Sequence, residues 1–403
     1  MKFNRAGLPG WTYHNEELFE LEASNIFKKN WQLVCHQSDL PNKGDYVTYD
    51  ILGERAILLR GVDHKVRAFH NLCRHRGSRL VVGDKGNCGK MITCPFHAWS
   101  YSLNGQLRGP AKPQSFPPLN RNEWGLKPIE LDEFMGFYFV KFKSSNYPKA
   151  SEILKRHKET FDQYQTKKLM SAGEISLSNC LSINWKTVRD VDNEGYHVAQ
   201  AHPGLHDLYG ENYRDEEYNF WSTVSVGKIN SKPSKLWTVR NYRSILAKLE
   251  KPWCDLPKQW YYIGIFPNAV FGFYPDSVIF YQEVPVKCNE TLIRSAVYKR
   301  PKESRHLKIL RYLSGRIDNS AVEEDNQLSE WLNEAPKSSG YEGSFLSDLE
   351  KGTSRPKSRI TIPRTPTHRW LVHRTVAPRR TPLELYTPAY QSASLVANQN
   401  HLY

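Results

Sequence analysis

The chain of 403 residues contains little cysteine, no long apolar run and no glycine-rich nucleotide motif. Seven cysteines, an odd number, argue against a disulfide framework. The apolar stretches fall far short of the roughly 20 residues that span a bilayer, and the start, Met1–Arg5, lacks the apolar character of a signal peptide. No G-x-G-x-x-G follows a strand-like segment, which argues against a bound nicotinamide or flavin. Together these absences predict a cytoplasmic protein that associates with no membrane.

Acidic residues are scarce at the C-terminal end. The formal net charge of +14 could indicate nucleic-acid binding. From Lys351 onward, however, nine Lys or Arg face one acid, Glu384, so that +8 of this charge belongs to the tail. The remainder is ordinary for a soluble globular protein, and we expect no nucleic acid. Residues 351–403 also carry six prolines and are predicted to be disordered. An altered reading frame near residue 352 is one hypothesis for this tail, and resequencing would test it.

Two short Cys-plus-His pairs are the most informative residues that are present. They follow the pattern C-x-H-x18-C-x2-H, formed by Cys73, His75, Cys94 and His97. Two thiolates and two imidazoles are the ligand set of a Rieske 2Fe-2S cluster. Zinc also accepts two Cys and two His, but zinc motifs usually place the thiols together and the imidazoles together, so zinc ranks second. Cys88 lies between the pairs without a matching His and is interpreted as structural.

A second group of acids and histidines follows the pattern Asp190-x3-Glu194-x2-His197-x4-His202. If the segment is helical, the first three of these residues share one face, and Pro203 ends the helix. Two imidazoles and one carboxylate form the facial triad of non-haem Fe(II) oxygenases. The simpler alternative is a polar helix with incidental histidines. That alternative is less favoured because a cluster motif precedes the group in the same chain.

The residues around both motifs carry a family resemblance. Asn71–Gly77 and Thr93–Trp99 resemble the two cluster loops of Rieske non-haem iron ring-hydroxylating oxygenase alpha (large terminal) subunits, and the resemblance covers roughly residues 8 to 350. It implies an α+β fold, with an N-terminal all-β Rieske 2Fe-2S domain and a C-terminal helix-grip (START-like) catalytic domain, an antiparallel sheet around a long helix. The domain organisation that we expect is an N-terminal helical segment at 1–35, the Rieske domain at 36–145, the catalytic iron domain at 146–350 and the tail at 351–403.

The resemblance also implies roles for individual residues. Cys73, His75, Cys94 and His97 would bind the cluster, and His197 and His202 would bind the mononuclear Fe(II). The third iron ligand would be an acid in Val322–Leu328, for which we choose Asp325, with Glu324 and Asp318 as alternatives. Glu194 would link a cluster histidine to an iron histidine, and together with Asp190 it is a candidate catalytic residue. Most members carry Asp at the Glu194 position. Glu resembles the carnitine and betaine type, which oxidises quaternary ammonium compounds.

Partners and substrate follow from the same resemblance. Electrons would come from a separate ferredoxin or flavin reductase, and ultimately from NAD(P)H. The chain would form a head-to-tail homotrimer, with a beta subunit possible. Dioxygen and a small substrate would react, either a quaternary ammonium compound or an aromatic compound as in aromatic catabolism. Two alternatives remain open: a Rieske electron-transfer protein without oxygenase activity, and a zinc-stabilised binding module.

Local patterns predict the elements that would carry these motifs. Residues 15–34 and 151–168 have helical apolar spacing, whereas 45–71 reads as short strands. Asn104-Gly105 is a hairpin signal, and 174–184 alternates as a strand that leads into the candidate iron helix. The aromatic-rich stretch Trp260–Val284 has strand-like spacing. Its rings would form core and pocket and would suit either a cation or an arene.

Overall fold

The N-terminal domain contains three small antiparallel sheets. The computed structural model describes residues 5–218, 221–249 and 255–350, so the basic tail and Cys254 lie outside the described residues. The sheets have the strand orders β4-β3-β2-β5, β6-β7-β8 and β1-β10-β9. Their strands are β1 (Gln32–His36), β2 (Asp45–Ile51), β3 (Glu54–Arg60), β4 (Val66–His70), β5 (Lys85–Asn87), β6 (Met91–Thr93), β7 (Ser100–Ser102), β8 (Leu107–Gly109), β9 (Glu130–Phe134) and β10 (Phe137–Lys141). The strands predicted within 45–71 and the hairpin at Asn104-Gly105 are confirmed.

The N-terminal helix is shorter than predicted. Helix α1 (Glu16–Glu22) begins after Asn15, whose side chain accepts a hydrogen bond from Leu18 N (2.7 Å), and a π-helical turn continues it to Phe27. Residues 32–36 instead form β1, which pairs with β10, and all five of its residues are buried. The predicted helix over 15–34 is therefore wrong beyond Phe27. The apolar residues at the end of this range pair with β10 instead. The domain boundary expected at residue 35 falls inside this strand.

The C-terminal domain is built on an eight-stranded antiparallel sheet in the order β11-β18-β17-β16-β15-β14-β13, with β12 paired to β18. Its strands are β11 (Met170–Ser171), β12 (Ser176–Leu177), β13 (Tyr213–Tyr218), β14 (Ser222–Lys228), β15 (Gln259–Ile265), β16 (Ala269–Phe273), β17 (Val278–Lys287) and β18 (Glu290–Lys299). The strand predicted over 174–184 is only the two residues of β12, because most of this segment does not pair along the sheet.

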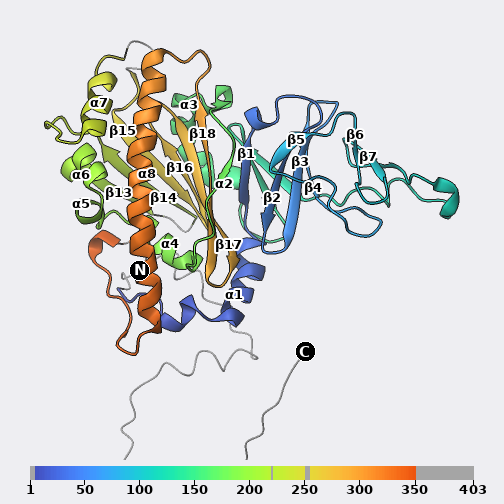
Figure 1. Ribbon diagram of the computed structural model, residues 1–403, viewed down its shortest axis with the longest axis horizontal. Coiled ribbons are helices and arrows are strands. Elements are labelled where there is room, and N and C mark those ends of the chain that lie inside the picture. The colour runs from blue at the N-terminus through green and yellow to red at the C-terminus, as the bar shows by residue number, and fades with distance from the viewer. Residues whose placement is uncertain (1–4, 219–220, 250–254, 351–403) are drawn as a thin grey trace, which may run out of the picture. The chain divides into compact units, whose positions relative to one another are not determined.

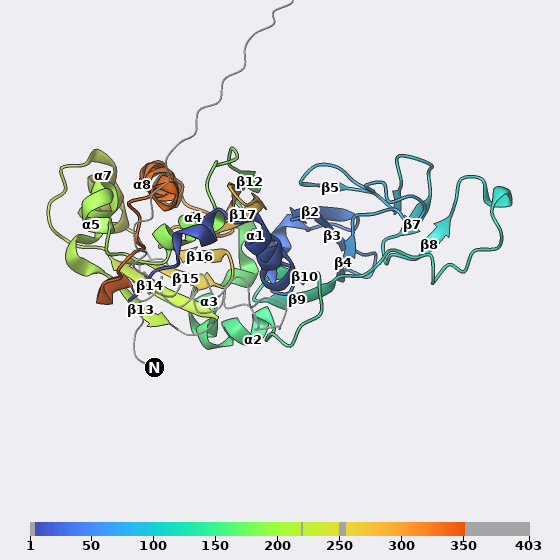
Figure 2. The same cartoon turned by 90° about the horizontal axis from the view of Figure 1, so that it is seen from below.

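Helices cover both faces of this sheet, as Figures 1 and 2 show. The long α8 (Arg305–Glu334) crosses one face together with α4 (Trp185–Asp192), whereas α2 (Ala150–Leu154) and α3 (Lys158–Gln163) lie on the other. Phe161 of α3 packs edge-to-face on Phe271 and Phe273. On the α8 side, Trp260 and Tyr274 form a buried cluster with leucines of that helix. The period of two along each strand therefore divides the aromatics between two cores, and the expected antiparallel sheet around a long helix is confirmed.

The remaining helices are α5 (Val198–Ala201), α6 (Pro203–Tyr209) and α7 (Trp237–Leu246). Helix α8 is capped by Ser304, whose hydroxyl accepts a hydrogen bond from Leu307 N (3.3 Å), and it carries charged residues along its length. Among the described residues, no helix combines the length and the apolar character that crossing a membrane requires.

Two buried histidines are expected to make the stability of the fold depend on pH. Burial lowers the pKa of His36 to about 4, and its Nε2 lies 3.0 Å from the carbonyl oxygen of Thr166. Burial also lowers the pKa of His157 to about 4. An unfolded chain takes up these protons near pH 6.5, whereas the native chain does so only near pH 4. Each histidine therefore lowers the free energy of unfolding by up to about 1.4 kcal/mol per pH unit as the pH falls through this window.

We expect His36→Gln to remove about half of this acid destabilisation, measured by urea unfolding at pH 7 and pH 5. The exposed His306 provides the control, because His306→Gln should leave the pH dependence as it is in the unaltered chain. An unchanged slope in the His36 variant would contradict the prediction.

Candidate functional site

The two Cys-plus-His pairs lie on loops that repeat one hydrogen-bond pattern. In the first loop, Cys73 N donates to Ser78 O (2.8 Å) and Gly77 N donates to Cys73 O (2.9 Å). In the second, Cys94 N donates to Trp99 O (2.8 Å) and Ala98 N donates to Cys94 O (3.0 Å). Gly77 and Ala98 both adopt positive φ, +74° and +52°, as a closed turn of this kind requires. Each loop therefore presents its cysteine from an equivalent backbone cradle.

The four predicted cluster residues are brought together. Cys73 and Cys94 are buried, at 4% and 2% exposed, and burial together with the nearby Cys94 thiol raises the pKa of the Cys73 thiol. The rings of His75 and His97 lie 4.8 Å apart. The Nδ1 atom of His75 is buried and has no hydrogen-bond partner among the described residues. Two adjacent thiols, two adjacent imidazoles and an unpartnered ring nitrogen fit a Rieske cluster.

Aromatic residues that the sequence reasoning did not assign surround this site. Trp99 stacks on the His75 ring, with centroids 5.1 Å apart and planes 1° from parallel, and Phe116 meets the same ring edge-on. On the outer side His97 is exposed, and so is its neighbour Phe96, at 55%. The site is therefore enclosed around His75 and open to solvent at His97.

Tyr101 also contacts the cluster site, and we expect it to influence the reduction potential of the cluster. Its hydroxyl lies 3.3 Å from Cys73 Sγ and accepts a hydrogen bond from Arg74 N (3.0 Å). A hydrogen bond to a cluster sulfur stabilises the reduced, more negative state and so raises the reduction potential. Tyr101→Phe should lower the midpoint potential by roughly 40 mV, the one-electron equivalent of about 1 kcal/mol. Redox titration followed by EPR would measure it, and a potential unchanged within about 10 mV would contradict the assignment.

The candidate iron segment is not one continuous helix, which corrects the prediction. Helix α4 begins at its cap Asn184, whose side chain accepts a hydrogen bond from Lys186 N (2.9 Å), and it ends at Asp192. His197 precedes α5, and Pro203 opens α6. Asp190 does not join the metal-binding atoms: its Oδ2 accepts a hydrogen bond from the hydroxyl of Tyr13 (2.5 Å). The face shared at i, i+4 and i+7 does not exist, because the helix ends before Glu194.

His197, His202 and Asp325 nevertheless converge, with one donor atom from each lying within 4.8 Å of the others. His202 Nε2 lies 3.0 Å from Asp325 Oδ1, and His197 Nε2 lies 3.6 Å from the same oxygen. The two Nε2 atoms are 3.0 Å apart. Two imidazole nitrogens and one carboxylate oxygen converging from α8 and from the loop after α4 are the donors of an iron facial triad, and they fit a mononuclear Fe(II).

A carboxylate orients each of the two imidazoles. His197 Nδ1 donates to Glu194 Oε1 (2.5 Å), and His202 Nδ1 donates to Glu324 Oε2 (2.7 Å). Such contacts fix the tautomer, so that each Nε2 faces the metal position. Glu324, an alternative third ligand, therefore supports His202. Asp318, the other alternative, accepts a hydrogen bond from the hydroxyl of Tyr274 (3.1 Å).

The charges of the three converging residues are coupled. Burial alone would lower the pKa of His197, but hydrogen bonds and charge from Asp325 and Glu194 raise it to about 10. Burial opposes the charged form of His202 in the same way, yet Asp325 and Glu324 raise its pKa. Burial would raise the pKa of Asp325, whereas the two histidines lower it. A cation that binds these three residues would therefore compete with protons for the imidazole nitrogens.

A buried charged network behind this site was missed by the sequence reasoning. Arg189 Nη1 contacts Asp192 Oδ2 (2.8 Å) and Glu283 Oε1 (3.1 Å), and the hydroxyl of Tyr281 donates to Asp192 Oδ1 (2.5 Å). An available signal was Glu283, an acid in the middle of a strand that is mostly apolar and buried.

Two protein-family models match the chain. A model described as the ring hydroxylating alpha subunit (catalytic domain) matches residues 154–361, and a Rieske [2Fe-2S] domain model matches residues 30–122. The first match continues past residue 351, where the resemblance seen in the sequence had ended.

Curated relatives share part of the chain. The carnitine monooxygenase oxygenase subunit of Escherichia coli (strain K12) is 34% identical over 207 residues, 50% of this chain and 53% of that protein. The glycine betaine monooxygenase oxygenase subunit of Pseudomonas aeruginosa (strain UCBPP-PA14) is 33% identical over 198 residues, 49% of this chain and 45% of that protein. The chain thus aligns with about half the length of the curated relatives it matches.

The match to solved structures is broader. A crystal structure of a quaternary ammonium Rieske monooxygenase in complex with an inhibitor superposes with a TM-score of 0.74 at 25% identity, covering 88% of this chain and 94% of that one. A naphthalene 1,2-dioxygenase structure superposes with a TM-score of 0.68 at 22% identity, covering 88% and 91%. The second likeness supports the fold alone.

Proposed function

The chain belongs to the ring hydroxylating alpha subunit family, and from this premise we propose that it is the terminal oxygenase component of a Rieske-type oxygenase. The observation that carries the proposal is the presence of two donor sets in one chain, the Cys73 and Cys94 loops and the group of His197, His202 and Asp325. An electron carrier needs only the first set, and a zinc module needs neither the mixed pairs nor the second set.

Each set has a distinct task in this proposal. Cys73, His75, Cys94 and His97 would hold the 2Fe-2S cluster, and His197, His202 and Asp325 would hold Fe(II). When bound, these groups supply single electrons and open coordination positions for dioxygen and substrate. The protein orients the imidazoles through Glu194 and Glu324 and shields His75 with Trp99.

The substrate that we propose is a small quaternary ammonium compound rather than an arene. Glu194 and the names of the relatives support this class. The charges around the ligands also support it, because Glu194 and Glu324 contact the two histidines while Asp192 and Glu283 share the one guanidinium of Arg189. An excess of acid favours a cation over a neutral ring. Oxygen insertion into such a substrate would be a mono-oxygenation.

A head-to-tail homotrimer is supported by where the two sites lie. Strand β7 and helix α5 lie toward opposite ends of the described unit in Figures 1 and 2, and β6 lies beside β7 in Figure 1. Exposed His97 would therefore approach Glu194 of a second copy more readily than its own. Light scattering should give about three times the 46.8 kDa of one chain. A larger mass of the native complex would indicate a beta subunit.

Reducing equivalents would come from a separate ferredoxin or flavin reductase that uses NAD(P)H. Arg74, Arg76 and Arg79 beside the cluster residues would attract an acidic partner. We propose a cytoplasmic location, where thiols stay reduced. All six cysteines among the described residues are free, which agrees with it.

The first test is metal and sulfide analysis, with visible and EPR spectra, of protein purified without oxygen. We expect about three irons and about two labile sulfides per chain, with a low-g signal on reduction. About two irons without the third would favour an electron carrier. Zinc without sulfide would overturn the proposal.

A further inference from the structure

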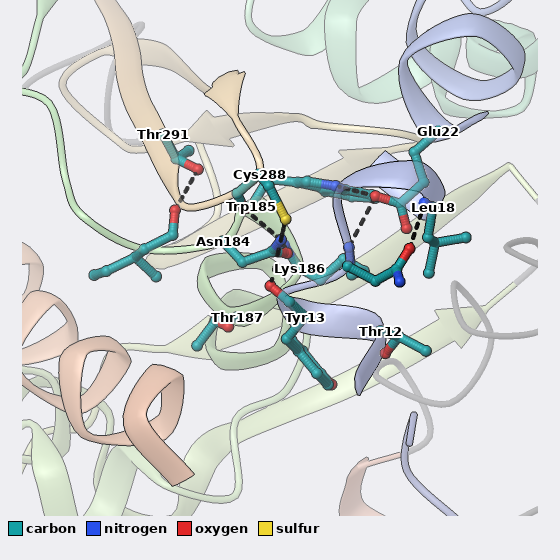
Figure 3. A network of polar contacts seen from close by, with 12 residues as sticks. Thr12, Tyr13, Leu18, Glu22, Asn184, Trp185, Lys186, Thr187, Cys288 and Thr291 are labelled. Carbon is teal, nitrogen blue, oxygen red and sulfur yellow. Dashed lines mark hydrogen bonds and ion pairs between the residues drawn. The ribbon is translucent and has the colours of Figure 1, made fainter. Parts of the chain in front are cut away.

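The start of α4 is held by a buried ion pair. Glu22, the last residue of α1, places its carboxylate between Trp185 and Lys186, the first two residues of α4 (Figure 3). Its Oε2 accepts hydrogen bonds from Trp185 Nε1 (2.9 Å) and Lys186 Nζ (2.8 Å). The side chains of Glu22 and Lys186 are 1% and 2% exposed. The two charged groups are therefore buried away from solvent and paired with each other.

Such a pair is a weak source of stability, because the cost of removing two charges from water can exceed their attraction. Lys186 Nζ gains from the rings of Trp185 (5.4 Å) and Tyr13 (6.0 Å). Glu22 Oε1, however, has no hydrogen-bond partner among the described residues. Apolar residues of similar volume could stabilise this position as well as the pair does. What the pair adds is a fixed distance and orientation between α1 and the first turn of α4.

Two hydrogen bonds of Asn184 also hold the start of α4. One of them reaches α8, the helix that carries Asp325. Asn184 Nδ2 donates to the carbonyl oxygen of Cys288 (2.6 Å), after β17. Asn184 N donates to Asn333 Oδ1 (3.1 Å) on α8. Asp325 lies about two turns before Asn333 on the same helix. One end of α4 is therefore fastened to the helix that supplies the carboxylate ligand, and its other end leads into the loop of the candidate iron histidines.

A small tilt of the first turn of α4 would displace the metal-binding atoms of the loop that follows this helix. Helix α4 has 8 residues and is about 12 Å long, so its C-terminal end moves with its first turn. Functional groups must hold their geometry within about 0.5 Å. We propose, on the basis of the function proposed above, that Glu22 and Lys186 are positioning residues for the mononuclear iron. The ion pair holds the first turn of α4, which Asn184 ties to α8, so that His197 and Asp325 stand at ligand distance.

The test separates positioning from stability. In Glu22→Gln/Lys186→Met, Gln still offers Trp185 an acceptor and Met retains the apolar stem of the lysine. We expect a folded protein with an intact cluster spectrum, Fe(II) affinity lowered about tenfold in chelator competition, and an altered EPR spectrum of the ferrous nitric oxide adduct. Glu22→Asp keeps the charge but shortens the arm, and it should lower the affinity less. This second variant keeps the test decisive if the double variant does not fold.

The matched control is Lys28→Met/Glu54→Gln. That ion pair (3.3 Å) also fastens the N-terminal segment, but to β3 rather than to α4. It should leave Fe(II) affinity and the nitric oxide spectrum unchanged. Wild-type Fe(II) affinity and an unaltered nitric oxide spectrum in folded Glu22 variants would overturn the inference. Absence of mononuclear iron from the unaltered protein would instead overturn the proposed function.

Discussion

Replacing Asp325 with alanine is expected to remove the mononuclear iron and abolish oxygenation, while the protein keeps the colour of its cluster. Asp325 Oδ1 lies 3.0 Å and 3.6 Å from the Nε2 atoms of His202 and His197, and it is the only carboxylate among the three converging donors. Two imidazoles alone leave a divalent cation without an anionic ligand and with incomplete coordination. We expect at least about a thousandfold loss of turnover, roughly 4 kcal/mol of transition-state stabilisation.

The measurement is iron and labile sulfide per chain, together with turnover with the reductase. Iron should fall by about one atom per chain, and sulfide should not change. Glu323→Ala on the same turn of α8 is the control, because Glu323 is exposed and lies outside the group of donors. If the Asp325 variant retains its iron, the third ligand is another acid, and Glu324→Ala should then remove the metal.

The parts of the site that could be predicted from the sequence are those whose residues lie close together along the chain. Each cluster pair lies on one short loop, so its spacing alone brings thiol and imidazole together. The choice of Asp325 over Glu324 used the family pattern, because spacing cannot place a ligand more than a hundred residues after His202. In the structure Glu324 contacts the outer nitrogen of that histidine, on the side away from the donor group. Adjacent acids on a helix point in different directions, which separates the two roles.

The end of α4 at Asp192 could not be read from periodicity, but the packing just after it can be explained. A Cβ on Gly195 would lie 1.7 Å from the ring of Tyr213, so the chain must take a residue without a side chain where that tyrosine packs. Gly also weakens a helix by about 1 kcal/mol relative to Ala. The ion pairs Arg189–Glu283 and Glu22–Lys186 could not be predicted either, because the two partners of each pair lie on different elements. The aromatic strands were easier, because alternation is a local property.

Replacing Glu194 with alanine is expected to leave both metals in place and yet nearly abolish oxygenation. Its Oε1 accepts a hydrogen bond from His197 Nδ1 (2.5 Å), so Glu194 contacts a ligand without belonging to the three donors. In the proposed trimer the same carboxylate faces exposed His97 of a neighbouring copy and joins the two sites. We expect turnover with the reductase to fall by at least about a hundredfold, or roughly 3 kcal/mol. Unchanged turnover would show that this route is wrong.

Glu324→Ala separates this role from simple orientation of a ligand. Glu324 contacts His202 Nδ1 (2.7 Å) as Glu194 contacts His197 Nδ1, so each variant takes a carboxylate from the outer nitrogen of an iron imidazole. Loss of orientation alone costs about 10- to 100-fold in metal affinity or activity and should be similar in the two variants. Only the Glu194 variant should also slow reoxidation of the reduced cluster when substrate and dioxygen are added. Equal slowing in both variants would assign Glu194 to orientation only, because only Glu194 is proposed to meet His97 of a second copy.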